Sequence, residues 1–255
     1  MKRLIIGALT VLVLPILVLG VEAVIAVSGM REDFRNPDPS PRAFAGTGAP
    51  LKYVVLGDST AAGQGADYEK GIAVGTASRL GETRAVELSN FGISGAKTAD
   101  VLENQVREAA TRKPDITLIA VGANDVTNLS SGGSVQRDLQ QIIDTLLDAK
   151  CDMKIVLTGS PDFRGAHRLM QPLRWVAGKR ADQINQSIQQ VIDEHGLTRA
   201  PIAPETGPLF QEDPSLLAAD RFHPNERGYA TWIPVLNKAI DEALRNQPDH
   251  CESIK

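Results

Sequence analysis

The stretch VVLGDSTAAGQG, Val54 to Gly65, changes character at its centre. An apolar run ends at Gly-Asp-Ser and gives way to small residues and glycines. If the apolar run is a strand, Ser59 stands where that strand ends and the next element begins. Open α/β sheets bind their ligands at this edge. Ser59 is therefore a candidate site residue, and the alternative is a serine that only caps a helix.

Short apolar runs alternate with longer amphipathic stretches along most of the chain. The apolar runs predict strands buried on both faces, at residues 53–56, 86–88, 116–121, 154–157 and 200–203. The amphipathic stretches predict helices at residues 98–111, 135–149, 181–195 and 226–245. Strands that alternate with helices in this way predict a parallel sheet with right-handed crossovers.

Size, charge and cysteine content narrow the classes of protein. With 255 residues, of which 42% are hydrophobic, the chain has enough apolar material for one sizeable core. A net charge of −4 argues against a nucleic-acid partner, which usually requires a concentrated basic face. Cys151 and Cys251 are too few for a disulfide framework and too far apart for typical zinc ligands. One bridge between them remains open.

The N-terminal residues predict a membrane segment. After Lys2 and Arg3 come 18 residues without charge, LIIGALTVLVLPILVLGV, at residues 4–21. This run is close to the roughly 20 residues that span a bilayer. We expect a retained signal anchor with the body of the protein outside the cytosol. The alternative is a cleaved signal peptide and a secreted protein, with Val24-Ile25-Ala26 as the cleavage site.

Composition divides the chain into four parts. Residues 1–30 form the anchor or signal segment, and residues 31–50 are rich in Pro, Gly and charge, which predicts a linker. Residues 51–246 hold the alternating strands and helices of one domain. Residues 247–255 form a polar C-terminal tail.

A serine nucleophile needs a base, and the chain has four histidines. His223 stands out because ADRFHPN places Asp220 three residues before it, on the approach to a helix. On a tight turn, this spacing lets the carboxylate accept a hydrogen bond from one imidazole nitrogen while the other faces a substrate. Asp-x-x-His alone is a weak motif, and an aspartate that caps a helix explains many instances.

Acyl transfer also requires donors aimed at the developing oxyanion. The sequence NFGISGAK after the second predicted strand contains Gly92 and Gly95, and VGAND after the third contains Asn124. Gly95 and Asn124 each have a structural alternative, as a loop glycine and as a turn cap. All these segments follow strands, so they are expected to converge at one edge of the sheet.

The four blocks together resemble the SGNH hydrolases, also called GDSL esterases and lipases. The blocks are Gly-Asp-Ser at 57–59, Gly95, Gly-x-Asn-Asp at 122–125 and Asp-x-x-His at 220–223. The resemblance runs from about residue 51 to 245. It implies a flavodoxin-like α/β/α sandwich with a five-stranded parallel sheet, usually in strand order 2-1-3-4-5.

The resemblance also implies roles for single residues. Ser59 is the expected nucleophile, His223 its base and Asp220 the residue that orients the base. The oxyanion hole would comprise the Ser59 N–H, the Gly95 N–H and the Asn124 side chain. The supporting residues of these blocks are Gly57, Asp58, Gly122 and Asp125. Thr60 departs from the family, where Leu or Ile often follows the serine.

The expected activity is hydrolysis of a carboxylic ester through an acyl-enzyme, without a metal or cofactor. A lipid, lysophospholipid or small acyl ester ranks first as substrate, because an aromatic content of 4% leaves little for a sugar-stacking platform. An O-acetyl esterase or O-acyltransferase of the cell envelope is the alternative. A non-enzymatic reading, an anion-binding flavodoxin-like module, leaves Asp220 and His223 without a role.

A basic and apolar stretch follows the fourth predicted strand. FRGAHRLMQPLRWVAGKR, residues 163–180, has five Arg or Lys residues and no acidic residue. At this position the stretch is expected to overhang the catalytic edge as a cover that meets anionic headgroups or an acidic substrate. A surface helix with one packed apolar side is the alternative.

Overall fold

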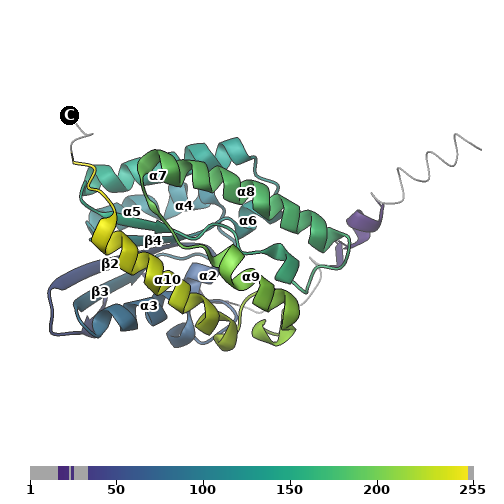
Figure 1. The fold of residues 1–255 in the computed structure, drawn as a ribbon, viewed down its shortest axis with the longest axis horizontal. Coiled ribbons are helices and arrows are strands. Elements are labelled where there is room, and N and C mark those ends of the chain that lie inside the picture. Colours follow the sequence, from purple (N-terminus) through teal and green to yellow (C-terminus); the bar gives the residue numbers. More distant parts are fainter. Residues whose placement is uncertain (1–16, 23, 26–33, 252–255) are drawn as a thin grey trace, which may run out of the picture.

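The computed structural model describes residues 17–22, 24–25 and 34–251. Within them a central sheet lies between two layers of helices, as Figure 1 shows. The long helices run roughly along the sheet, and the chain crosses from one strand to the next through helices. The described residues therefore form the α/β/α sandwich that the resemblance to the SGNH hydrolases implies.

The strands of the described part form one sheet in the order β1-β3-β2-β4-β5-β6. Their bounds are β1 Arg42–Ala45, β2 Pro50–Gly57, β3 Ala85–Asn90, β4 Ile116–Ala120, β5 Lys154–Leu157 and β6 Thr198–Arg199. Strands β2 to β6 pair in parallel, so the carboxyl ends of β2, β4 and β5 meet at one edge. Counted from β2, their order is the expected 2-1-3-4-5.

The sheet is not the five-stranded parallel one that the sequence predicts, because β1 adds a sixth strand that runs antiparallel to β3. Strand β1 comes from the stretch expected to be a linker. Arg42 at its start forms two hydrogen bonds with the carboxylate of Glu69. Strand β1 has only four residues, and two of them are alanines, so it gives no strand signal of its own. Its stability comes from pairing with β3.

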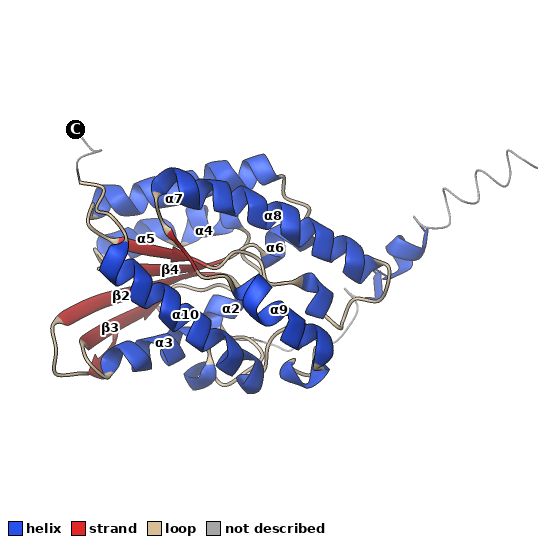
Figure 2. Cartoon of the chain, viewed as in Figure 1, coloured by secondary structure: helices blue, strands red, loops and turns tan. Residues whose placement is uncertain are grey.

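Helices cover both faces of the sheet, which Figure 2 shows in blue around the red strands. Helices α4 Thr98–Asn104, α5 Val106–Thr111, α7 Gly132–Ala149 and α8 Leu173–His195 cover one face. Helices α3 Ile72–Gly81, α9 Ile202–Glu212 and α10 Glu226–Asn246 cover the other. The short elements are α2 Ser59–Ala62, η1 Tyr68–Lys70, α6 Ala123–Thr127, η2 Phe163–Gly165 and η3 Pro214–Leu216.

Two apolar clusters, one on each face of the sheet, form the core. Alternate residues of β2 separate cleanly between them: Val54 and Leu56 pack with α7 and α8, and Tyr53 and Val55 pack with α3 and α10. This is why β2 reads as a continuous apolar run, since both of its faces are covered.

Two predicted elements differ from the structure. The predicted helix 98–111 is broken at Gln105, which separates α4 from α5. The predicted strand 200–203 is misplaced, because the strand is Thr198–Arg199 and residues from Ile202 onward form α9. Pro204 and Pro208 disguise this helix, although Pro204 lies in its first turn, where a missing N–H costs little.

The predicted N-terminal anchor lies mostly outside the described residues. Residues 17–22 and 24–25 are helical, and nothing tests the span predicted at 4–21. Within the described ranges, no helix has both the length and the apolar character needed to cross a bilayer.

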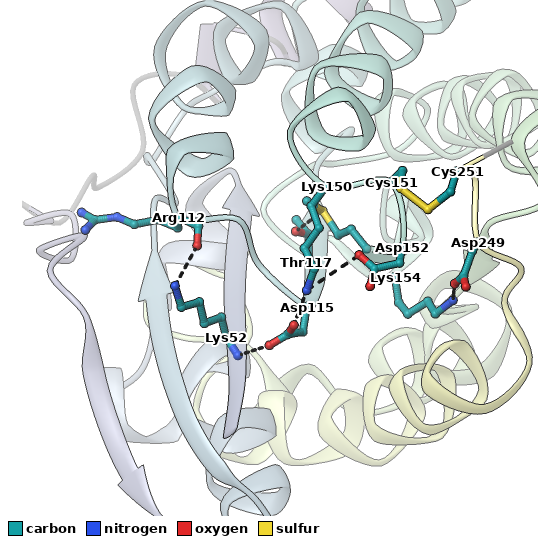
Figure 3. Close-up of polar contacts among 11 residues, drawn as sticks. Lys52, Arg112, Asp115, Thr117, Lys150, Cys151, Asp152, Lys154, Asp249 and Cys251 are labelled. Carbon is teal, nitrogen blue, oxygen red and sulfur yellow. Dashed lines mark hydrogen bonds and ion pairs between the residues drawn. A yellow bond between two sulfur atoms is a disulfide. The ribbon is translucent and has the colours of Figure 1, made fainter. Parts of the chain in front are cut away.

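A disulfide joins Cys151, just before β5, to Cys251 in the C-terminal tail. Figure 3 shows it beside Lys154, which forms an ion pair with Asp249. Gln247 adds a further tie, because its Oε1 accepts the N–H of Ile155 at 2.9 Å. The tail is therefore fastened to the end of the sheet opposite Ser59.

Removing this disulfide is expected to destabilise the domain. The bridge spans 100 residues of sequence. A disulfide typically contributes about 2–4 kcal/mol by restricting the unfolded chain, and more when it closes a longer loop. Cys251→Ser should lower the free energy of unfolding by that amount in urea titrations, and dithiothreitol should lower the wild type equally. A wild type whose unfolding midpoint does not respond to dithiothreitol would contradict the prediction.

Candidate active site

Ser59 begins α2 directly after β2, in the position that the sequence predicts. Gly57 has φ +142°, and a Cβ there would overlap the carbonyl oxygen of Ala120 in β4, so only glycine fits. Asp58 then caps the short helix, because its Oδ1 accepts from the Thr60 N–H and the Thr60 hydroxyl, both at 2.8 Å. The Gly-Asp pair thus fixes the turn that presents Ser59 at the sheet edge.

His223 lies beside Ser59 although 164 residues separate them. Its Nε2 is 2.9 Å from Ser59 Oγ, and its Nδ1 is 2.5 Å from Asp220 Oδ2. The other oxygen of Asp220 accepts the backbone N–H groups of Phe222 and His223. Asp220 therefore holds both the ring and the loop that carries it.

Electrostatics favour an ionised Asp220. Burial raises the pKa of this carboxyl, but the hydrogen bonds from His223 and the backbone outweigh that effect and lower the pKa overall. An ionised carboxylate can only accept, which keeps a proton on His223 Nδ1 and leaves the lone pair of Nε2 facing Ser59. A hydroxyl, an imidazole and a carboxylate in this order can generate a nucleophilic serine.

Gly95 lies in the loop that follows β3, and Asn124 lies in α6, which follows β4 at the same edge of the sheet as Ser59. The Ile93 N–H donates to Gly57 O at 3.1 Å, which holds the loop after β3 against the end of β2. The Asn124 side chain donates to Ala96 O at 3.1 Å. Gly95 has φ +86° and open space where a Cβ would be, whereas the Gly92 N–H is taken by Asn90 Oδ1. Of the two glycines, Gly95 is thus the one suited to donate to a ligand.

The supporting residues of the third block hold these loops in place. Gly122 has φ +125°, in the turn between β4 and α6. Asp125 is buried, and its Oδ2 accepts from both the N–H and the hydroxyl of Thr98 at the start of α4. Asp125 thus ties the Asn124 helix to the segment that follows Gly95.

Sequence reasoning missed Gln105. This buried side chain forms two hydrogen bonds with Gly57, accepting its N–H at 2.9 Å and donating to its carbonyl at 2.8 Å. Gln105 stands at the break between α4 and α5 and stabilises the end of β2 just before Ser59. No motif or spacing marks it, because one glutamine in a helical stretch reads as a surface residue.

A small pocket, with a cavity volume of about 40 Å³, opens beside Ser59 and His223. Its wall is mainly apolar, and the side chains that form it include Phe163, Ala166, Phe210, Leu217, Phe222 and Trp232. The wall comes from η2, α9, α10 and the loop of His223. Such a pocket suits a hydrocarbon chain better than a hydrated group.

Cations in the basic stretch 163–180 bond to other groups of the protein, which the sequence does not reveal. Arg164 pairs with Asp162 and Asp182, and Arg180 donates to the carbonyl oxygens of Val126 and Ser130. These two cations are therefore largely occupied within the protein. Across the described ranges, no cluster of three or more His, Cys, Asp or Glu is arranged to hold a metal ion.

Asp58 is a buried carboxyl without a cation bonded to it. Burial raises its pKa to about 6, and the hydrogen bonds from Thr60 only partly oppose this rise. Because the folded pKa lies above the unfolded value of 3.8, folding favours the protonated form. The contribution of Asp58 to stability is therefore greatest below pH about 4 and is lost as the pH rises through about 6.

Asp58→Asn is expected to remove this pH dependence, because an amide oxygen can still accept from Thr60 but carries no charge. Relative to the wild type, the variant should gain roughly 1–3 kcal/mol of unfolding free energy between pH 4 and pH 7.5. Urea unfolding of both proteins at the two pH values measures this difference. Parallel pH dependences for the two proteins would contradict it.

The fold and these four blocks define a class of protein. Residues 55–231 match the model of the GDSL-like lipase/acylhydrolase family, which confirms the resemblance seen in the sequence. The chain belongs to this family.

Individual relatives are distant. The GDSL-like esterase Rv1075c of Mycobacterium tuberculosis is 28% identical over 207 residues, which are 78% of this chain and 64% of the relative. The crystal structure of TesA matches with a TM-score of 0.63 and 19% identity, over 75% of this chain and 99% of TesA. A catalytic mutant of Axe2, an acetylxylan esterase from Geobacillus stearothermophilus, matches with a TM-score of 0.59 and 20% identity, over 79% and 96%. These two structures support the fold.

Proposed function

We propose that this protein hydrolyses carboxylic esters through an acyl-enzyme on Ser59, with His223 as general base and Asp220 orienting it. The observation that carries the proposal is the hydrogen-bonded chain from Ser59 Oγ to His223 Nε2, at 2.9 Å, and from His223 Nδ1 to Asp220. The three side chains are at most about one-eighth exposed, so bulk water weakens these interactions little.

The reaction proceeds in two steps. Ser59 Oγ attacks the ester carbonyl while His223 Nε2 takes the hydroxyl proton, and the same nitrogen then gives this proton to the departing alcohol. A water molecule next attacks the acyl-enzyme with His223 again as base, and the acid and free Ser59 are released. Asp220 stays ionised throughout and stabilises the imidazolium that forms in each step.

The oxyanion would bind the Ser59 N–H, the Gly95 N–H and the Asn124 side-chain amide. Ser59 is the first residue of α2, so its N–H has no partner within that helix. Asn124 donates one N–H to Ala96 O, which leaves its second N–H for a substrate oxygen.

Asn124→Ala is therefore expected to lower kcat by about 10²- to 10³-fold with a much smaller change in KM, because the oxyanion exists mainly in the transition state. The matched control is Asn128→Ala, one turn further along, where the exposed side chain bonds only nearby groups. Steady-state kinetics with p-nitrophenyl acetate measure both. Equal kcat values for the two variants would remove Asn124 from the proposed oxyanion hole.

The apolar pocket supports an acyl chain of a lipid, lysophospholipid or other small ester as the part of the substrate that binds there. The main rival is an O-acetylated carbohydrate, the substrate class named for the acetylxylan esterase Axe2. The mainly apolar wall, which includes Phe163, Phe210 and Trp232, favours an acyl chain over a hydrated carbohydrate.

A panel of p-nitrophenyl esters from acetate to palmitate, together with lysophosphatidylcholine and acetylated xylan, tests the substrate class. We expect kcat/KM to rise from acetate to a medium-length chain by about 10-fold or more, since each buried methylene contributes about 0.8 kcal/mol. A preference for acetate and for acetylated xylan would favour the carbohydrate esterase.

We also propose that the catalytic domain lies outside the cytosol, tethered by residues 4–21 or secreted after their removal. The disulfide between Cys151 and Cys251 supports this proposal, because such bonds persist in oxidising compartments and are rare in the cytosol. Fractionation of cells that express the full chain, followed by protease treatment of intact spheroplasts, tests it.

A further inference from the structure

Exposed apolar side chains are concentrated in two segments of the described chain. Eight of the ten large apolar side chains that are exposed there belong to residues 17–25 or 170–176. We call these eight the apolar patch: Leu17, Val18, Val21, Val24, Ile25, Met170, Trp175 and Val176. Trp175 is 56% exposed and Met170 is 52% exposed, which is unusual for side chains of this size.

A buried carboxylate joins the two segments. Glu22 is only 6% exposed, and its Oε2 accepts the backbone N–H of Leu173, the first residue of α8, at 2.9 Å. Figure 1 shows the N-terminal helix beside this end of α8. Glu22 thus attaches the N-terminal helix to α8, while the apolar side chains around Glu22 are exposed.

The apolar patch is directly connected to the active site. Two residues before Met170, the N–H of Arg168 donates to Arg221 O at 2.8 Å. Arg221 lies between Asp220 and His223 in the catalytic loop. Phe163 and Ala166, which precede Arg168 in the sequence, line the pocket. Whatever covers the patch therefore lies close to the loop of His223.

We propose that the apolar patch lies in the interfacial layer of a lipid bilayer and holds the active site at the membrane surface. The charge-free run at 4–21 leads directly into the patch and overlaps it at Leu17, Val18 and Val21. Tryptophan and other large apolar side chains favour the boundary between headgroups and acyl chains, and Arg174 and Lys179 nearby can meet phosphate groups. This inference rests on the proposed function. If the active site lies at the membrane surface, the substrate is an ester that resides in the membrane.

The two tryptophans of the chain permit a direct spectroscopic test. Trp175 is exposed, whereas Trp232 is 4% exposed and serves as an internal reference. The full chain is reconstituted in phosphatidylcholine vesicles that contain lipids brominated on the acyl chain. We expect strong quenching of the wild type by the brominated lipid and little quenching of Trp175→Phe, which retains only Trp232.

Other occupants of the patch give different results. If Trp175 faces water, iodide quenches it and brominated lipid does not, and the proposal fails. If a second copy of the chain covers the patch, Trp175 is shielded from both quenchers and its emission shifts with protein concentration, which also overturns the proposal. These readouts do not depend on catalysis, so they remain informative even if Ser59 is not a nucleophile.

Measurements of esterase activity test the proposal independently of the fluorescence experiment. Met170→Ser combined with Trp175→Ser is expected to lower turnover of a long-chain ester carried in vesicles by about 10-fold, and to leave hydrolysis of soluble p-nitrophenyl acetate unchanged. Leu129→Ser, which changes an exposed apolar side chain outside the patch, should alter neither rate. Unchanged turnover in vesicles, or an equal loss on both substrates, would contradict a membrane role for the patch.

Discussion

Ser59→Ala is expected to lower kcat/KM for a short p-nitrophenyl ester by about 10⁴-fold or more. Without Oγ, His223 Nε2 loses the hydroxyl that it activates, and what activity remains would come from water attacking in the oxyanion hole. The substitution removes one oxygen from a side chain that is 5% exposed and bonded to His223, so the fold should be retained.

Ser187→Ala provides the matched control. The Ser187 hydroxyl bonds only the carbonyl of Gln183 in its own helix, α8, and it does not line the pocket. This variant should keep the activity of the wild type. Retention of full esterase activity by Ser59→Ala, with a normal circular dichroism spectrum, would place the nucleophile elsewhere.

Asp220→Asn is expected to lower kcat by about 10⁴-fold. The amide oxygen can replace Oδ1 and keep the bonds from the N–H groups of Phe222 and His223, so the loop should keep its shape. The amide NH₂ then faces His223 Nδ1 and donates to it. This moves the imidazole proton to Nε2, where it blocks transfer from Ser59.

The control for this substitution is Asp213→Asn. Asp213 caps η3 in a similar way, with Oδ1 accepting the N–H and the hydroxyl of Ser215, but its side chain is 45% exposed and does not line the pocket. Its replacement should leave kcat unchanged. Similar kcat values for Asp220→Asn and Asp213→Asn would mean that Asp220 only shapes its loop.

The fold was largely predictable because buried parallel strands leave a strong local signal. The runs around Val55, Leu118 and Val156 are apolar on both faces, and each belongs to a strand of the sheet. Strand β1 and helix α9 were not predictable. Arg42–Ala45 becomes a strand only through pairing with β3, and α9 carries prolines that usually mark loops.

Some residues of the candidate site were likewise predictable from the sequence, and others were not. Ser59, His223 and Asp220 are recognisable because each stands beside a strand end or a helix start in a recurring pattern, and the structure brings them together. Gln105 and the pocket wall have no such pattern. A buried glutamine bonded to Gly57, or a phenylalanine such as Phe210 facing a cavity, depends on tertiary contacts that sequence spacing does not reveal.

The charge of the basic stretch 163–180 was also misjudged from the sequence alone. Arg164 has no acidic neighbour within 163–180, yet it forms ion pairs with Asp162, two residues before it, and with Asp182 in α8. Charge counted along a short window therefore overstates the free positive charge at this surface. The proposed contact of this stretch with the membrane therefore rests more on the exposed apolar side chains of Met170 and Trp175 than on its positive charges.

The most direct test of the central claim is covalent labelling with a fluorophosphonate, which reacts with serines activated by a neighbouring base. The intact protein should gain the mass of one phosphonyl group, peptide mapping should locate it on Ser59, and His223→Ala should abolish labelling. Labelling on another serine, or none in a folded protein that still hydrolyses esters, would contradict Ser59 as the nucleophile.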